Sequence, residues 1–284
     1  MRLQHILFPY DFSAPADRIA PHVQALARST RARVTLMSVI PPAFDPGPPG
    51  IVRAEGAAGV DRALELENVQ RQLDKALPTE MSDVALTRLV VRGDPAIQIA
   101  AFVEAHEVDL VMMPTHGVGV FRRFLVGSVT AKVLHDAKCP VWTAAHLDAS
   151  SSAPLPRRII CAIDNSQGGS DLAQWAVAFA GLVGAPLTLL HVVEPVTDWP
   201  TNEGERQLQE QERDYARRSL ETRLKSAGIE LPLRLVVGRI VETVVEQARA
   251  DQTDLLIVGR GSMARLRTHA FAIIQDSPCP VLSV

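Results

Sequence analysis

Short apolar runs alternate with stretches of helical periodicity along the chain. In the first half the apolar runs, rich in Val, Ile and Leu, span 4–10, 33–39, 85–91, 109–113 and 140–144, and the helical stretches span 15–30, 61–77, 95–107 and 128–137. Strands that are apolar throughout are buried on both faces, as in a parallel sheet covered by helices. The pattern therefore predicts an α/β fold with a doubly wound, five-stranded parallel sheet. Such sheets bind ligands beyond the carboxyl ends of their strands, where the strand order reverses.

The second half of the chain repeats the first. His5–Ser13 resembles Arg158–Ser166, because each is an apolar strand ending in Asp-x-Ser, and Asp164 lies 153 positions after Asp11. Later segments match at an offset of 145, and Cys-Pro-Val recurs at an offset of 140. The order of the matched segments is unbroken, which indicates duplication with loops of unequal length. We expect two tandem Rossmann-like domains, 1–147 and 157–284, joined by a linker at 148–156 with a Ser-, Ala- and Pro-rich composition.

Composition and charge exclude several classes of partner. The net charge of -3 offers no global positive field for nucleic acid. No apolar stretch approaches the ~18 residues of a membrane span, and the N-terminus lacks the features of a signal peptide. Cys139, Cys161 and Cys279 lack the spacing of a zinc or redox motif, so we expect buried free thiols. These features predict a cytoplasmic protein without a nucleic-acid or membrane partner.

One loop of the first domain has the composition of a phosphate site. Met113-Pro114-Thr115-His116-Gly117 follows the fourth strand, and nine residues later Gly127-Ser128 precede a helix that begins near Val129. Glycine permits close approach of the backbone to a phosphate, and a helix N-terminus presents unpaired N–H groups. Gly127 and Ser128 could alternatively form only a turn and an N-cap. Asp11 and Asp164 could likewise only cap the helices that follow them.

This segment resembles the universal stress protein family. The resemblance rests on Pro114–Val141 and on the strand ending Phe8–Ser13, and it covers both halves, as in tandem members of the family. Nucleotide-binding members carry Gly, two residues, Gly, nine residues, then Gly with Ser or Thr. Gly117, Gly127 and Ser128 fit that pattern, whereas Pro114 stands at the first glycine position and has no N–H to donate.

The resemblance implies that the first domain binds ATP, with or without Mg²⁺. Pro9 and Asp11 would lie at the adenosine, and the main chain near Val39 would face the adenine ring. The ribose and phosphates would be held by Gly117, Gly127, Ser128 and Val129.

The corresponding loop of the second domain departs further from the pattern. Asp164, Gly259, Gly261 and Thr268 are its candidate ligand residues, but the loop is five residues shorter. Alignment through Cys279 puts Arg267 at the position of Gly127 and Thr268 at that of Ser128. A side chain at the glycine position should obstruct the backbone, so we expect a degenerate site.

The sequence leaves three functions open. The first is an ATP-binding regulatory or stress-response protein without efficient turnover, and the second is a slow ATPase or nucleotidyl transferase on the same fold. The third is a nucleotide-free scaffold for dimerisation or protein interaction. We assign no catalytic residue, since no second acid or base is spaced to act with His116, and no metal site, since the histidines lack ligand spacing. The loop 41–50 could be a lid or a plain connection.

The resemblance also implies assembly through the last strand of each domain. Val141–Ala144 and Val281–Val284 would then pair within one chain, as an internal pseudo-dimer that covers two exposed sheet edges. The whole chain could also form a homodimer. The sequence identifies no protein partner.

Overall fold

The computed structural model describes residues 1–42, 55–79, 81–116, 126–144, 155–195, 202–260 and 264–284, with the backbone alone at 55–61 and 264–268. The proposed linker at 148–156 and the loop 41–50 lie mostly outside these ranges. The elements of the first half are β1 (His5–Pro9), α1 (Ala14–Thr30), β2 (Arg33–Ile40), α2 (Glu55–Lys75), β3 (Leu86–Arg92), α3 (Pro95–Ala105), β4 (Leu110–Pro114), α4 (Ser128–Asp136) and β5 (Val141–Ala144). Those of the second half are β6 (Ile159–Ala162), α5 (Gln167–Val183), β7 (Leu187–Val193), α6 (Glu203–Ser226), β8 (Leu233–Val237), α7 (Ile240–Ala250), β9 (Leu255–Val258), α8 (Ala264–Asp276) and β10 (Val281–Ser283).

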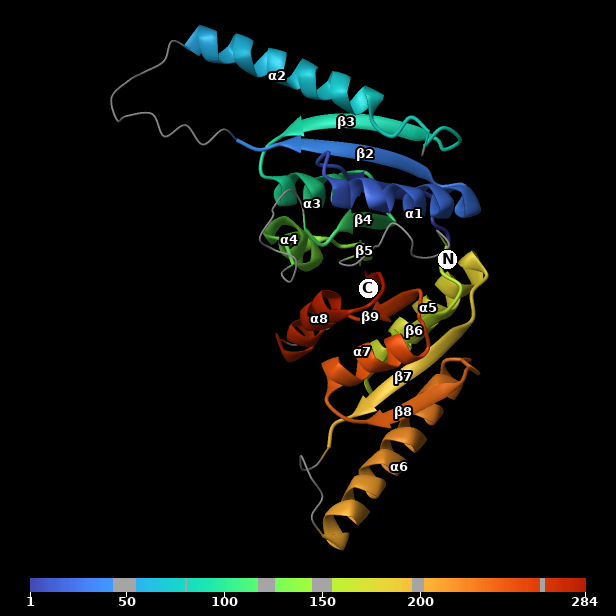
Figure 1. Ribbon diagram of the computed structural model, residues 1–284. Helices are drawn as coiled ribbons and strands as arrows, with labels where there is room; N and C mark the ends of the chain where they lie inside the picture. Colours follow the sequence, from blue (N-terminus) through green and yellow to red (C-terminus); the bar gives the residue numbers. More distant parts are fainter. Residues whose placement is uncertain (43–54, 80, 117–125, 145–154, 196–201, 261–263) are drawn as a thin grey trace, which may run out of the picture.

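The strands form one continuous sheet in the order β3-β2-β1-β4-β5-β10-β9-β6-β7-β8 (Figure 1). Within each half all pairs are parallel, and the strand order of the second half repeats that of the first. The two halves join where β5 and β10 pair antiparallel, with Trp142 opposite Leu282. This confirms the doubly wound α/β fold and the pairing of the last strands within one chain. Each of these strands thereby covers the other's open edge.

Helices cover both faces of the sheet, which explains why its strands are apolar throughout. Neighbouring residues of β1 point to opposite faces: Phe8 belongs to one core cluster and Leu7 to the other, and both are fully buried. The first cluster includes residues of α1, α2, α5 and α6, and the second includes residues of α3, α4, α7 and α8. Both clusters continue from one half into the other. The resulting three layers bury the sheet completely along its centre.

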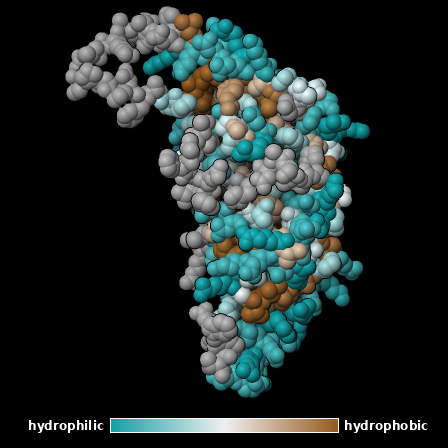
Figure 2. Space-filling model, viewed as in Figure 1, coloured by the Kyte–Doolittle hydropathy of each residue, from teal (hydrophilic) through white to brown (hydrophobic). Residues whose placement is uncertain are grey.

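The surface is mainly hydrophilic in the view of Figure 2, with hydrophobic patches that include one below α2. In the ranges that the structure covers, no helix has the length and apolar character needed to cross a membrane. The three cysteines are free and buried, as predicted.

The helix starts follow from local chemistry, with one correction. Asp94 caps α3 by accepting from the Ile97 N–H at 3.0 Å, with Pro95 in the first turn. The alternative that Asp11 and Asp164 cap α1 and α5 is wrong. The caps are the hydroxyls of Ser13 and Ser166, two residues further on in each repeat.

Candidate functional site

The candidate site lies where the strand order of the first domain reverses. From β1 the chain runs outward through β2 and β3, then crosses back to β4 on the other side of β1 (Figure 1). The helices that follow β1 and β4 lie on opposite faces of the sheet, and a crevice is expected between the ends of these two strands. A cleft of about 570 Å³ occupies this position. Its volume is in the range of small-molecule and cofactor sites, roughly 300–1,000 Å³.

The structure brings together most of the first-domain residues expected from the sequence. Those that line the cleft are Pro9, Asp11, Val39, Gly127, Ser128 and Val129. Gly117 lies outside the residues that the structure describes. The lining residues come from the ends of β1 and β2 and from the start of α4, three segments far apart in the chain.

Sequence reasoning missed the apolar floor of the cleft. Met37, Ile99 and Met113 line it and are almost completely buried, and Val39 beside them is half-buried. They come from β2, α3 and β4, and in the sequence they look like ordinary core residues. The alternation along β2, in which Met37 and Val39 share one side of the strand, was the available signal. The floor is apolar, and an apolar surface is the kind on which an aromatic base can lie.

The N-terminus of α4 forms the polar wall. Gly127 is its N-cap and has no capping side chain, so the N–H groups of the first turn, at Ser128, Val129 and Thr130, have no acceptor within the helix. The Gly127 N–H itself donates to the Thr115 carbonyl at 2.6 Å. A β-carbon at Gly127 would lie 3.2 Å from that oxygen, which makes glycine the residue best suited to this close approach. Gly127 is therefore an N-cap and a cleft residue at once.

A buried hydrogen bond ties α4 to the end of β4. The hydroxyl of Thr130, which is 3% exposed, donates to the Pro114 carbonyl at 3.0 Å. Pro114 is the last residue of β4 and lies beside Ala144 of β5. Proline can occupy this last position of β4 although it has no N–H. The hydrogen bond to the Ala144 carbonyl of β5 comes from the N–H of the next residue, Thr115. The departure from the glycine pattern thus leaves the sheet pairing intact.

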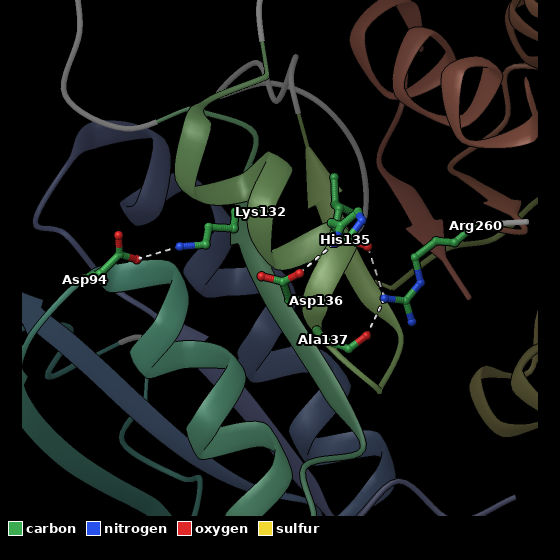
Figure 3. Close-up of polar contacts among 7 residues, drawn as sticks. Asp94, Lys132, His135, Asp136, Ala137 and Arg260 are labelled. Atoms are coloured by element: carbon green, nitrogen blue, oxygen red, sulfur yellow. Dashed lines mark hydrogen bonds and ion pairs between the residues drawn. The ribbon is translucent and has the colours of Figure 1, made fainter. Parts of the chain in front are cut away.

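Charged groups lie at the rim. Asp11 is exposed and accepts from the Ser13 N–H at 3.1 Å, which holds its carboxylate at the end of β1. Lys132 of α4 pairs with Asp94 of α3 at 3.6 Å (Figure 3). The Ile97 N–H, with further help from Lys132, lowers the pKa of Asp94 below its ordinary value. This ion pair joins the two helices that wall the cleft.

His116 lines the cleft, and its Nδ1 lies 3.0 Å from the Thr115 hydroxyl. Among the described residues, no three His, Cys, Asp or Glu side chains gather closely enough to hold a metal ion.

In the second domain, the described candidate residues Asp164 and Gly259 do not line a common cleft. Asp164 accepts from the Ser166 N–H at 3.2 Å and from the Ser166 hydroxyl at 2.5 Å. The backbone at the start of α5 packs closely against Asp164, since a β-carbon at Gly169 would lie only 2.1 Å from the Asp164 carbonyl oxygen. A cleft of about 470 Å³ lies on this domain, but Asp164 and Gly259 are not among its lining residues. Asp164 is therefore held within its own turn.

The expected position of Thr268 at a helix start is wrong. α8 begins at Ala264, so Arg267 and Thr268 lie inside the helix and not at its N-terminus. The shortened loop of the second domain is thus accompanied by about one extra turn at the start of the helix, which moves its free N–H groups away from the expected position. Gly261 lies outside the described residues.

The comparisons with known proteins agree with the fold. The model of the universal stress protein family matches residues 2–144 and again 156–284. A universal stress protein of Methanocaldococcus jannaschii is 31% identical over 137 residues, covering 48% of this chain and 78% of its own, and one of Thermus aquaticus is 30% identical over 142 residues, covering 48% and 94%. A crystal structure of a universal stress protein from Archaeoglobus fulgidus matches with a TM-score of 0.66 and 18% identity, over 99% of this chain and 96% of that chain.

Proposed function

The chain belongs to the universal stress protein family, and from this premise we propose that its first domain binds an adenine nucleotide, ATP in the first instance, in the cleft at the carboxyl ends of β1 and β4. The nucleotide regulates the protein, and efficient turnover is not its role. The second domain contributes no equivalent site.

One observation supports this proposal above the others. A single cleft has an apolar floor at one end and the uncapped N-terminus of α4 at the other. An adenine ring fits the floor formed by Met37, Ile99 and Met113, with the main chain near Val39 at its edge. The N–H groups of the first turn, which have no acceptor within the helix, and the positive dipole end at Ser128 suit phosphates. Asp11 lies at the rim, within reach of a ribose placed between the two.

A regulatory role without efficient turnover agrees with how few of the described residues lining the cleft can act as an acid or a base. The described lining residues that carry a proton-transferring side chain are Asp11, His116 and Tyr10, and the Tyr10 hydroxyl already donates to Asp17 at 2.5 Å. Bound nucleotide would act by favouring one arrangement of the chain over another, through its different affinity for the two.

The test is a calorimetric titration of nucleotide-stripped protein with ATP and Mg²⁺, in wild type and in Gly127→Asp. Aspartate is a favourable N-cap, which offsets the 3.2 Å contact of its β-carbon with the Thr115 carbonyl, and its carboxylate would repel a phosphate at the helix N-terminus. We expect one ATP per chain in wild type and a loss of affinity of at least about tenfold in the variant.

The matched control is Gly204→Asp, in the first turn of α6. It adds the same carboxylate at a helix N-terminus, where its β-carbon would meet the side-chain oxygen of Asn202 at 3.3 Å, whereas the 3.2 Å contact at Gly127 is with a backbone oxygen. This variant should bind ATP as wild type does. Absence of binding by wild type, checked with a second probe, would refute the proposal. Two ATP per chain would refute the assignment to one domain, and multiple turnovers on the time scale of binding would favour the enzyme instead.

A further inference from the structure

A side chain of the second domain reaches across the domain junction to the helix of the candidate site. Arg260 follows β9 and Gly259 directly, in the loop that corresponds to the site loop of the first domain. Its guanidinium donates to two carbonyls at the end of α4, those of Leu134 at 3.3 Å and Ala137 at 2.6 Å (Figure 3). It also donates to the carbonyl of Cys139, which follows the helix, at 2.8 Å. Carbonyls in the last turn of a helix have no partner within it. Arg260 therefore caps the C-terminus of α4, whose N-terminus forms the polar wall of the cleft.

Among the described residues these carbonyls are the only hydrogen-bond partners of the Arg260 guanidinium, and none of them is an acid. Partial burial lowers the pKa of Arg260, so its partly buried charge needs compensation. The negative end of the α4 dipole, about half an elementary charge, supplies it. Removing either side would leave a buried polar group unsatisfied, which makes this contact stronger than an exposed ion pair.

Side-chain packing around Arg260 is incomplete, so the hydrogen bonds of Arg260 contribute a larger share of what holds α4 against the second domain. A cavity of about 210 Å³ lies between α4 and α8, lined by Leu134 and Ala137 on one side and by Ala270, Phe271 and Ile274 on the other. Apolar side chains that face a cavity lose contacts on that side. The hydrogen bonds of Arg260 thus bridge a junction that side-chain packing does not fill.

The residue of the first domain that corresponds to Arg260 is Thr115, and its side chain stays within its own domain. Thr115 stands 145 positions before Arg260, and the N–H groups of both donate to the last described residue of the adjoining strand, Ala144 and Val284. The Thr115 side chain turns back to the Ala144 carbonyl at 3.1 Å, within its own domain. Arg260 of the second domain therefore holds the site helix of the first, and Thr115 does not make the equivalent contact with the second.

We infer that Arg260 is a positioning residue for the nucleotide cleft of the first domain. The inference rests on the proposed function. Because one helix carries the ligand at one end and Arg260 at the other, nucleotide binding and docking of the second domain strengthen each other. The nucleotide state of the first domain is thereby passed to the junction between the domains.

The experiment uses the full chain and compares wild type, Arg260→Gln and Arg260→Lys. Arg234→Gln is the control, because Arg234 is also part-buried in the second domain and its guanidinium is also hydrogen-bonded, to the side chains of Gln247 and Asp251, at the far edge of the sheet. Amide hydrogen exchange over 126–139 is measured without nucleotide, and ATP affinity is measured by calorimetry.

We expect exchange in α4 to rise by about tenfold and ATP affinity to fall by about tenfold in Arg260→Gln. Arg260→Lys should recover part of both, since an ammonium can reach fewer carbonyls at once. Arg234→Gln should change neither, even if its thermal midpoint falls. ATP should slow exchange at the C-terminus of α4 in wild type and less so in Arg260→Gln, a response that a purely structural role would not produce.

Unchanged exchange in α4 of Arg260→Gln would overturn the inference, as would an equal loss of affinity in Arg234→Gln. If wild type does not bind ATP, the proposed function fails on that result. The exchange rates without nucleotide then still decide whether Arg260 holds α4.

Discussion

Thr130 offers a sharp test of how α4 is attached beside the cleft. Thr130→Val keeps the shape of the side chain but removes the hydroxyl that donates to the Pro114 carbonyl at 3.0 Å. The lost hydrogen bond is worth about 1 kcal/mol, and a buried carbonyl left without its partner adds about 1 kcal/mol or more, so we expect a loss of about 2 kcal/mol. For a chain of this size the thermal midpoint should fall by roughly 4–8 °C.

The informative comparison is with Thr130→Ser, which keeps the hydroxyl and loses a methyl group worth about 1 kcal/mol. Denaturation in urea, followed by circular dichroism, should rank wild type first, the serine variant second and the valine variant last. If apolar burial governed this position, valine would equal or exceed wild type. A valine variant at least as stable as the serine variant would refute the role of the hydrogen bond.

Three further predictions concern the rest of the molecule. Asp94→Ala should lower the thermal midpoint by removing the carboxylate that accepts from the Ile97 N–H, and the advantage of wild type over the variant should fade as the pH falls through the pKa of Asp94, which lies below its ordinary 3.8. His5 is buried, and burial lowers its pKa below 6.5, so the unfolded chain takes up a proton first. Stability should therefore fall as the pH is lowered through about 6.5, and the urea midpoint of His5→Gln should depend less on pH in that range. Burial raises the pKa of the Cys139 and Cys279 thiols to about 11 each, so iodoacetamide at about pH 8 should label them only when the chain unfolds, and labelling of the native protein within minutes would contradict this.

Most of the fold could be predicted from local sequence patterns. Strands buried on both faces leave runs such as Leu110–Pro114 apolar throughout, and the capping chemistry of Asp94-Pro95 marks the start of α3. The repeat could be predicted from the sequence because each half needs the same residues at the same turns. The geometry of the loop before α8 in the second domain could not be predicted in this way. An alignment through Cys279 put Thr268 at a helix start, whereas α8 begins at Ala264, because a shorter loop can be accommodated by a longer helix without any change in the matched residues.

The sequence by itself determined the α/β class, the tandem repeat and the polar half of the candidate site, since helix starts, glycine positions and strand ends depend on neighbours along the chain. Tertiary structure alone decided that Met37, Ile99 and Met113 form one apolar floor and that Thr130 reaches Pro114. It also decided that Arg260 caps α4, 121 to 126 positions away in the chain. Such contacts depend on how segments far apart in the chain meet in space. A single arginine in a loop has the same local sequence whether its guanidinium meets water, a phosphate or the end of another domain's helix.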